Sequence, residues 1–202
     1  LIAKTFSSQG IDSILELLKY FIGVVIVLFI HLFVVYLPLV KLIAKVNIIN
    51  FFSGLKQALL FAFSTSSSSA TIPITLNNLE KSFNVKKKVS SFTVPLGATI
   101  NMDGTAIMQG MATIFIANFY GIELIFTDFL TIILTAALAS IGTAGVPGVG
   151  MIMLGMVLNQ VGLPLEGIAI VMGVDRLLDM LRTSLNVAGD ATVTLLINKL
   201  EK

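Results

Sequence analysis

The sequence lacks cysteine and contains few charged residues. Without cysteine, its 202 residues form neither a disulfide nor a thiolate metal site. Charged residues are 12% of the chain, against about 25% in soluble domains, whereas hydrophobic residues are 56% and the mean hydropathy is +0.98. The net charge of +2 comes from lysines in short connecting segments, which argues against a nucleic-acid partner. The composition predicts an integral membrane protein in contact with lipid.

A leader is also missing from the printed sequence. It begins Leu1-Ile2-Ala3, without methionine or a signal peptide, and soon becomes apolar. We expect a piece of a longer multi-pass chain of the cell (inner or plasma) membrane.

Two apolar segments are long enough to cross a bilayer. After a connector at 1–12, residues 14–40 are apolar except for a few polar side chains, which predicts a tilted transmembrane helix. The segment 167–199 predicts another long helix. His31 has no acidic neighbour at helical spacing, so we assign it no role.

Two other regions predict re-entrant helical hairpins. Residues 51–63 supply only about 13 apolar residues before the serine-rich run 64–69, too few to span a bilayer. We predict a hairpin over 48–80 with the serines at its tip; the alternative is a flexible serine linker. A second hairpin is predicted over 128–161, with the glycine-rich tip 142–150.

The helix predicted between the hairpins, 89–122, is interrupted at 97–105. Asn101, Asp103 and the glycines there are poor helix formers. An unwound turn at membrane depth is tolerated where it lines a cavity, and it exposes carbonyl oxygens. With Asn101 and Asp103 these oxygens are hard ligands for a small cation.

The lysines predict the orientation. On one side of the predicted topology lie Lys41, Lys45, Lys56, Lys81, Lys86, Lys87, Lys88, Lys199 and Lys202. By the positive-inside rule this side is cytoplasmic, so the first hairpin enters from the cytoplasm and the second from outside. Each hairpin precedes a helix with an Asn/Asp cluster, which indicates an inverted repeat around a midplane site.

A polar stripe marks the last helix. Asp175, Asp179, Arg182, Asn186 and Asp190 fall on one helical face among apolar neighbours. Ionisable groups at membrane depth are costly and usually functional. Arg182 suits a carboxylate and Asp179 an ammonium group, so an acidic amino acid would satisfy both. Alternatively the two pair with each other. In that case Asp103, Asp175 and Asp190 have only Arg176 left as a partner for an ion pair. Bound cations would balance the surplus of negative charge.

Four motifs occur in a fixed order from the first hairpin nearly to the C-terminus. They are Ser66-Ser67-Ser68-Ser69-Ala70-Thr71-Ile72-Pro73, Asn101-Met102-Asp103-Gly104-Thr105, Ser140-Ile141-Gly142-Thr143-Ala144-Gly145-Val146-Pro147-Gly148, and Asp179-x-x-Arg182-Thr183-x-x-Asn186-Val187-x-Gly189-Asp190. With these motifs the chain resembles the dicarboxylate/amino acid:cation symporter family, which includes sodium-coupled glutamate and aspartate transporters. The resemblance implies that residues 13–202 are most of a transport domain that moves like an elevator against a homotrimeric scaffold absent from this chain.

The resemblance also implies site residues. Arg182 would hold the substrate's side-chain carboxylate and Asp179 its amino group. The full substrate set would be Ser67, Ser68, Thr105, Val146, Gly150, Asp179, Arg182, Thr183 and Asn186. One sodium site would use Gly97, Asn101, Asn186 and Asp190. A second would use Thr99 with backbone oxygens of Ser140, Ile141 and Thr143. Asn101 and Asp103 would form half of a third site. Relatives carry arginine at the positions of Ser66 or Met180, and Gln109 replaces a glutamate of potassium-coupled relatives.

The expected function is therefore sodium-coupled symport of acidic amino acids, with protons as the alternative coupling ion and no organic cofactor. Symport of C4-dicarboxylates or neutral amino acids is the nearest alternative, and a passive ion channel shares the carbonyl-lined breaks. We expect no enzyme: an intramembrane protease would need Gly-x-Ser-Gly with a histidine, or Gly-x-Gly-Asp with a second aspartate, and neither glycine pattern occurs.

Overall fold

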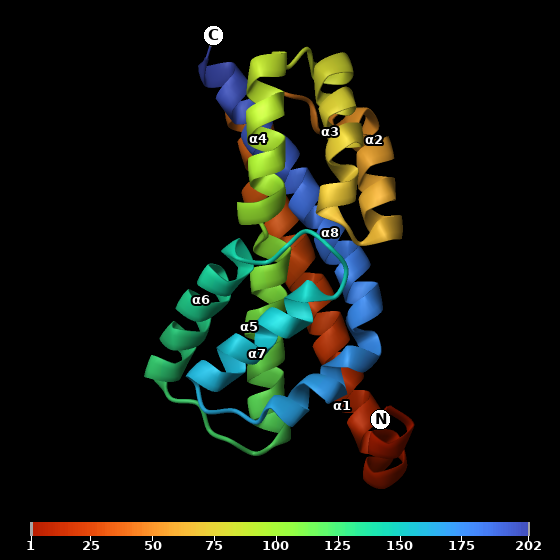
Figure 1. Cartoon of the computed structure of the whole chain (residues 1–202), viewed down its shortest axis with the longest axis vertical. Coiled ribbons are helices and arrows are strands. Elements are labelled where there is room, and N and C mark those ends of the chain that lie inside the picture. The colour runs from red at the N-terminus through yellow and green to blue at the C-terminus, as the bar shows by residue number, and fades with distance from the viewer. Residues whose placement is uncertain (1, 202) are drawn as a thin grey trace.

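The computed structural model describes the backbone of residues 2–201 and the side chains of 14–201, and over this range all regular structure is helical. The helices are α1 (Ile2–His31), α2 (Ile48–Thr65), α3 (Ser68–Phe83), α4 (Lys87–Ile100), α5 (Asp103–Phe119), α6 (Phe126–Ile141), α7 (Val149–Gln160) and α8 (Ile168–Leu200) (Figure 1). The all-α prediction is confirmed.

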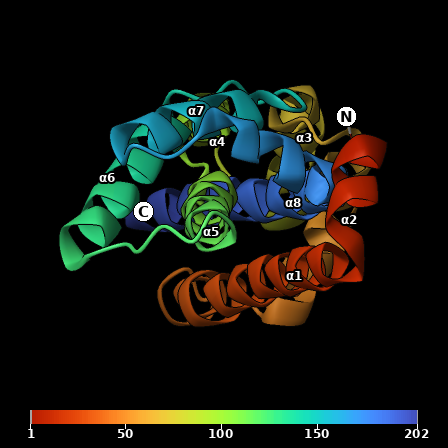
Figure 2. The same ribbon diagram turned by 90° about the horizontal axis from the view of Figure 1, so that it is seen from below.

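Helix α8 is the centre of the fold. It contacts α1, α2, α3, α4, α5 and α7. From Leu185 to Thr192 every residue is buried, as expected for a helix surrounded on all sides. Seen from below, α1 lies on one side of α5 and α8, and α6 and α7 lie on the other (Figure 2). The polar stripe of α8 is therefore enclosed by the rest of the chain.

Helix α1 presents much of its apolar surface outward. Its backbone is helical from Ile2, where a connector at 1–12 was expected; the side chains of 1–13 lie outside the described residues. Two π-helical stretches, Leu32–Tyr36 and Leu39–Ile43, continue it. By length and composition, the 30 residues Ile14–Ile43 are long and apolar enough to cross a membrane. Only 22% of the most apolar 18 residues in this segment are buried.

Helices α2 and α3 form the first hairpin. Asn47 accepts the Ile49 N–H (2.8 Å) to begin α2, and Ser66 ends it with a left-handed backbone (φ 53°). Ser67 then caps α3 by accepting the Ala70 N–H (3.1 Å). Helix α2 has 18 residues and passes the length and hydropathy test for a span. Ile48–Asn50 and Ser64–Thr65 join the 13 apolar residues counted in the sequence, so α2 has the length and composition of a candidate span.

Two further breaks shape the middle of the chain. Helix geometry is lost at Asn101 (φ −101°, ψ 68°) and Met102 (φ −112°, ψ 53°), inside the stretch 97–105 where an interruption was expected. Helices α6 and α7 form the second hairpin, whose connection ends at Gly148 with φ 81°, a conformation that favours glycine. Both breaks face α8, so they bring irregular backbone to its polar stripe.

The lysine-rich segments gather at one end of the molecule. The start of α4 adjoins the end of α8, where the Lys86 N–H donates to Asn198 Oδ1 (3.1 Å) and Lys86 Nζ to the Glu201 carbonyl (3.0 Å). The open end of the first hairpin lies at the same end, at the top of Figure 1.

Candidate functional site

Arg182 is the centre of the first half of the polar stripe, which we call the guanidinium half (Asp175, Asp179 and Arg182). Its side chain is 1% exposed. Nη2 donates to Asp175 Oδ1 (3.0 Å) and to Asp179 Oδ1 (2.9 Å). Arg182 Nε and Nη1 are buried without a hydrogen-bond partner among the described residues. The alternative pairing of Asp179 with Arg182 is thus present, and Asp175 pairs with Arg182 and not with Arg176.

The tips of the two hairpins meet beside this half. The Gly145 carbonyl accepts hydrogen bonds from Ser67 Oγ (2.7 Å) and from the Ser69 N–H (3.1 Å). The Gly148 N–H donates to Asp179 Oδ2 (3.3 Å). Figure 1 shows the α6–α7 connection crossing the middle of the molecule next to the α2–α3 turn. Segments about 80 residues apart in sequence therefore form one wall, as the separation of Ser67 from Gly145 shows.

The second half of the stripe, the amide half (Asn186 and Asp190), contacts neutral donors. Asn186 Oδ1 accepts the Gly104 N–H (2.9 Å), and its Nδ2 donates to Thr105 Oγ1 (3.4 Å). Asp190 is 3% exposed and accepts a bond from Asn101 Nδ2 (3.0 Å). Its carboxylate lies so close to Gly97 that a Cβ there would collide with it. Glycine at 97 is what gives this carboxylate room.

A small polar cavity lies between the two halves and the hairpin tips. Its walls include most of the predicted substrate residues, namely Ser68, Thr105, Val146, Gly150, Asp179, Thr183 and Asn186. Ser67 and Arg182 do not line it. The Ser67 hydroxyl is bound to the Gly145 carbonyl. Arg182 lies behind Gly150: a Cβ added to this glycine would be 3.5 Å from Arg182 Nη1. Sequence reasoning missed Ser66, which lines the cavity with a buried hydroxyl that has no hydrogen-bond partner among the described residues.

The predicted cation ligands are only partly brought together. Asn101 contacts Asp190 beside Gly97, as in the first expected site. The Thr99 hydroxyl is exposed and donates to the Leu96 carbonyl, and no hydrogen bond joins it to the described residues 140–143. Within 14–201 no group of three or more His, Asp or Glu side chains could hold a metal ion. A cation here would depend on carbonyl and amide oxygens around single carboxylates.

Asp103 has partners that the sequence did not suggest. Tyr36 OH donates to Asp103 Oδ2 (2.7 Å), and His31 Nε2 lies 3.0 Å from the same oxygen. His31 is the last residue of α1, and Tyr36 is the last residue of the π-helical stretch that follows it. His31 was set aside because it lacks an acidic neighbour along the helix, and its neighbour comes instead from α5. A π-helical register change near a polar cluster is common at functional sites.

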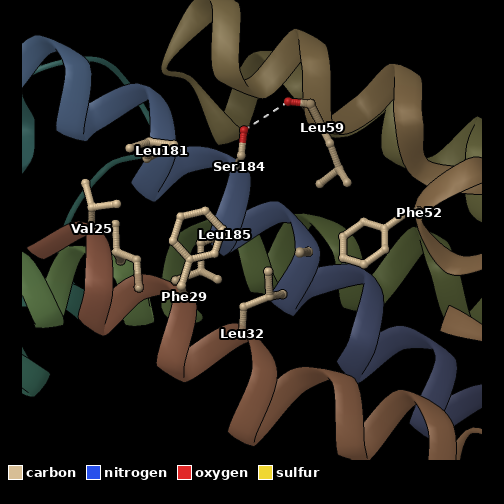
Figure 3. A pocket seen from close by; sticks show the side chains of 10 residues that line it. Val25, Phe29, Leu32, Phe52, Leu59, Leu181, Ser184 and Leu185 are labelled. Carbon is tan, nitrogen blue, oxygen red and sulfur yellow. Dashed lines mark hydrogen bonds between the residues drawn. The ribbon is translucent and has the colours of Figure 1, made fainter. Parts of the chain in front are cut away.

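A separate pocket between α1, α2 and α8 is almost purely apolar. Figure 3 shows its side chains, including Val25 and Phe29 from α1, Leu32 from the first π-helical stretch and Phe52 from α2. Its polar group is Ser184, whose hydroxyl is bound to the Leu59 carbonyl (3.0 Å). It offers a charged ligand no partner, so the polar cavity is the candidate site.

Comparison with known proteins shows the family of this chain. The sodium:dicarboxylate symporter family matches residues 1–200, which include both hairpins and the whole polar stripe. The chain belongs to this family. Excitatory amino acid transporter 1 of Homo sapiens is 47% identical to it over 176 residues, or 87% of this chain and 32% of the relative. Excitatory amino acid transporter 3 of Mus musculus is 44% identical over 173 residues, 86% of this chain and 33% of the relative.

An excitatory amino acid transporter of Caenorhabditis elegans is 46% identical over 181 residues, 89% of this chain and 36% of the relative. The chain therefore spans about a third of the length of these relatives. The family is one of symporters, and these relatives are named as transporters.

Proposed function

We propose that this chain forms the substrate-binding and cation-binding part of a sodium-coupled symporter of acidic amino acids. The observation that supports it best concerns Arg182: its buried Nε and Nη1 donors have no hydrogen-bond partner among the described residues, and they lie beside the carboxylate of Asp179. A buried guanidinium donor without a partner costs free energy. A ligand carboxylate would satisfy it with charge-assisted hydrogen bonds.

The substrate's amino group would bind Asp179. Asp179 Oδ1 already accepts a hydrogen bond from Arg182 Nη2, and Asp179 Oδ2 accepts one from the Gly148 N–H. An ammonium group would replace one of these donors or bind beside them. Because Gly150 lies over Arg182, the substrate reaches the guanidinium when the start of α7 moves away. We therefore assign α7 and its tip as the part of the site that opens. Ser66, Ser68, Thr105, Thr183 and Asn186 would supply the remaining polar contacts.

Sodium is the transported partner ion, with protons as the alternative. Asn101 contacts Asp190 through its Nδ2 (3.0 Å). Oxygens of Asp190, Asn101, Asn186 and Gly97 would form a hard donor set that suits Na⁺. The space against Gly97 keeps the Asp190 carboxylate available to that set. Asp103 with Asn101, and Thr99 with the carbonyls of Ser140, Ile141 and Thr143, are proposed as further ligands.

The membrane arrangement follows from the same assignment. We propose that both hairpins are re-entrant, that they are related by an inverted repeat, and that residues 13–202 move as one transport domain against a trimeric scaffold in the plasma or inner membrane. The meeting of both tips at Gly145 supports a midplane site between them.

The test is uptake of radiolabelled aspartate and glutamate by the full-length protein that contains this chain, reconstituted in proteoliposomes, with sodium and pH gradients varied separately. Sodium-driven accumulation of acidic amino acids above the outside concentration supports the proposal. Flux that only equilibrates would indicate a channel, and uptake of succinate or alanine alone would move the substrate to another class.

A further inference from the structure

A groove runs along the outer face of the first hairpin, between α2 and α3, and it changes character along its length. It consists of two adjoining hollows that share Gln57 and Asn77. At the open end the lining is Ser53, Gly54, Lys56, Asn78, Lys81 and Ser82. Toward the tip it is Leu60, Phe61, Ser64, Pro73 and Ile74. We call the whole feature the hairpin groove: cationic and polar at one end, mainly apolar at the other.

The floor of the groove is built by close contact of the two helices. A Cβ on Gly54 would collide with the ring of Phe83, so glycine lets the end of α3 approach. Ala58 is fully buried, and its N–H donates to Asn78 Oδ1 (3.2 Å). These contacts fix the walls relative to each other, so the groove is a feature of the hairpin fold and does not depend on surface rotamers alone.

The positive charge of the groove has no ion-pair partner among residues 14–201. Lys56 and Lys81 are exposed, and neither forms an ion pair with any described carboxylate. The apolar end is equally open: Leu60 is 56% exposed and Phe61 38%. From Lys56 to Ser64 the groove follows two turns of α2, about 12 Å. An occupant that complements both ends carries an anionic head and an apolar tail.

We propose that the hairpin groove binds one anionic phospholipid, with its phosphate between Lys56 and Lys81 and an acyl chain over Leu60 and Phe61. A free phosphate would use only the cationic end, and an uncharged lipid only the apolar end. The lysine-rich end is the side predicted to be cytoplasmic, and anionic lipids concentrate in the cytoplasmic leaflet. The site is separate from the polar cavity, whose lining shares no residue with the groove.

The charge can be tested by native mass spectrometry of the detergent-purified full-length protein that contains this chain, titrated with dioleoyl phosphatidylglycerol or dioleoyl phosphatidylcholine. We expect Lys56→Gln with Lys81→Gln to weaken phosphatidylglycerol binding by roughly 30-fold, from the usual contribution of a lysine near an anionic lipid. The matched control, Lys87→Gln with Lys88→Gln, removes two exposed charges from the start of α4 and should change it less than about threefold. Equal losses in both double variants would mean general surface attraction and would overturn the proposal.

The tail is tested with phosphatidylglycerol that carries a diazirine on its acyl chain. Photolabelling should concentrate on peptides containing 57–64 and 73–77 and should disappear in the Lys56/Lys81 variant. Leu60→Asn should weaken binding several-fold, whereas Leu134→Asn, on the exposed face of α6, should not. If inorganic phosphate at millimolar concentration displaces the lipid and Leu60→Asn has no effect, the groove is a simple anion site. Labelling elsewhere on the chain would also reject it.

Discussion

The two halves of the polar stripe on α8 both contain buried carboxylates, but these carboxylates have different partners: an arginine in one half and an amide in the other. In the guanidinium half, two carboxylates share one nitrogen of a buried arginine, and two of its other donors have no partner in the described structure. In the amide half, a buried carboxylate meets an amide donor and a glycine, with no cationic side chain in an ion pair with it among residues 14–201.

This difference indicates two kinds of ligand on one helix. A buried cation with spare donors favours an anion, whereas a buried anion with only neutral partners favours a cation. The halves are less than three helical turns apart, from Arg182 to Asp190, so ligands in the two would attract each other across about 12 Å. Coupling between substrate and ion then has a simple electrostatic basis.

The largest expected effect comes from breaking the guanidinium half. Arg182→Cys should weaken binding of aspartate and glutamate by about 100-fold or more, because loss of a buried charged partner typically costs about 3 to 5 kcal/mol. Serine and alanine, which have no second carboxylate, should lose far less. Competition binding in saturating sodium measures all four ligands. Arg176→Cys, an exposed arginine on the same helix, is the control.

If Arg182→Cys weakens all four ligands by the same factor, Arg182 is only a structural partner of Asp175 and Asp179. The contrast between the halves would then be one of packing and not of ligand charge.

The second test breaks the amide half. Asp190→Asn keeps the shape of the side chain but removes its charge, and we expect about a tenfold or greater rise in the sodium concentration needed for half-maximal binding. The ranking of amino acids should stay unchanged. Sodium titrations of substrate binding check this, with Asp128→Asn as control because an asparagine there can still accept the Ile125 N–H. An unaltered sodium dependence would contradict the cation assignment of Asp190.

A smaller effect should follow from pushing the hairpin tips apart. In Gly145→Ala the new methyl group would meet the side chains of Ser68 and Ser69, and such overpacking costs about 1 to 3 kcal/mol. Because the serine side chains are short and can rotate, we expect the lower end of this range, a fall of about fivefold in substrate affinity, while sodium binding at the amide half changes little. Gly155→Ala in α7, whose Cβ would make only ordinary contacts at 3.7 Å, is the control. Equal losses in the two variants would show that the tips do not matter for the guanidinium half.

The smallest expected effect concerns Ser67, which both caps α3 and binds Gly145. Ser67→Ala should lower the free energy of unfolding by about 1 to 2 kcal/mol. Asn47→Ala removes a cap without an inter-hairpin bond and should cost about 1 kcal/mol or less. Chemical denaturation in detergent compares them. If Ser67→Ala and Gly145→Ala lower stability additively, the bond between the tips carries no energy of its own, and the coupling of the hairpins must be sought elsewhere.

The sequence by itself determined the helical class, the membrane composition and the polar stripe. Helical periodicity places Asp175, Asp179, Arg182, Asn186 and Asp190 on one face because their spacing is local, and the motifs identify the family because they are read along the chain. The glycines and Asn101 likewise indicated where helix geometry is lost, since backbone preference depends on the residue itself.

Only the tertiary structure decided which groups meet. His31 and Tyr36 reach Asp103 from about 70 residues away, Gly145 accepts from Ser67, and Arg182 serves two carboxylates where the sequence suggested one. The ends of α2 fit the hairpin predicted over 48–80, but the groups that fix them, the Asn47 cap and the left-handed Ser66, are seen only in the structure. These features depend on how helices pack, and periodicity carries information about one helix at a time.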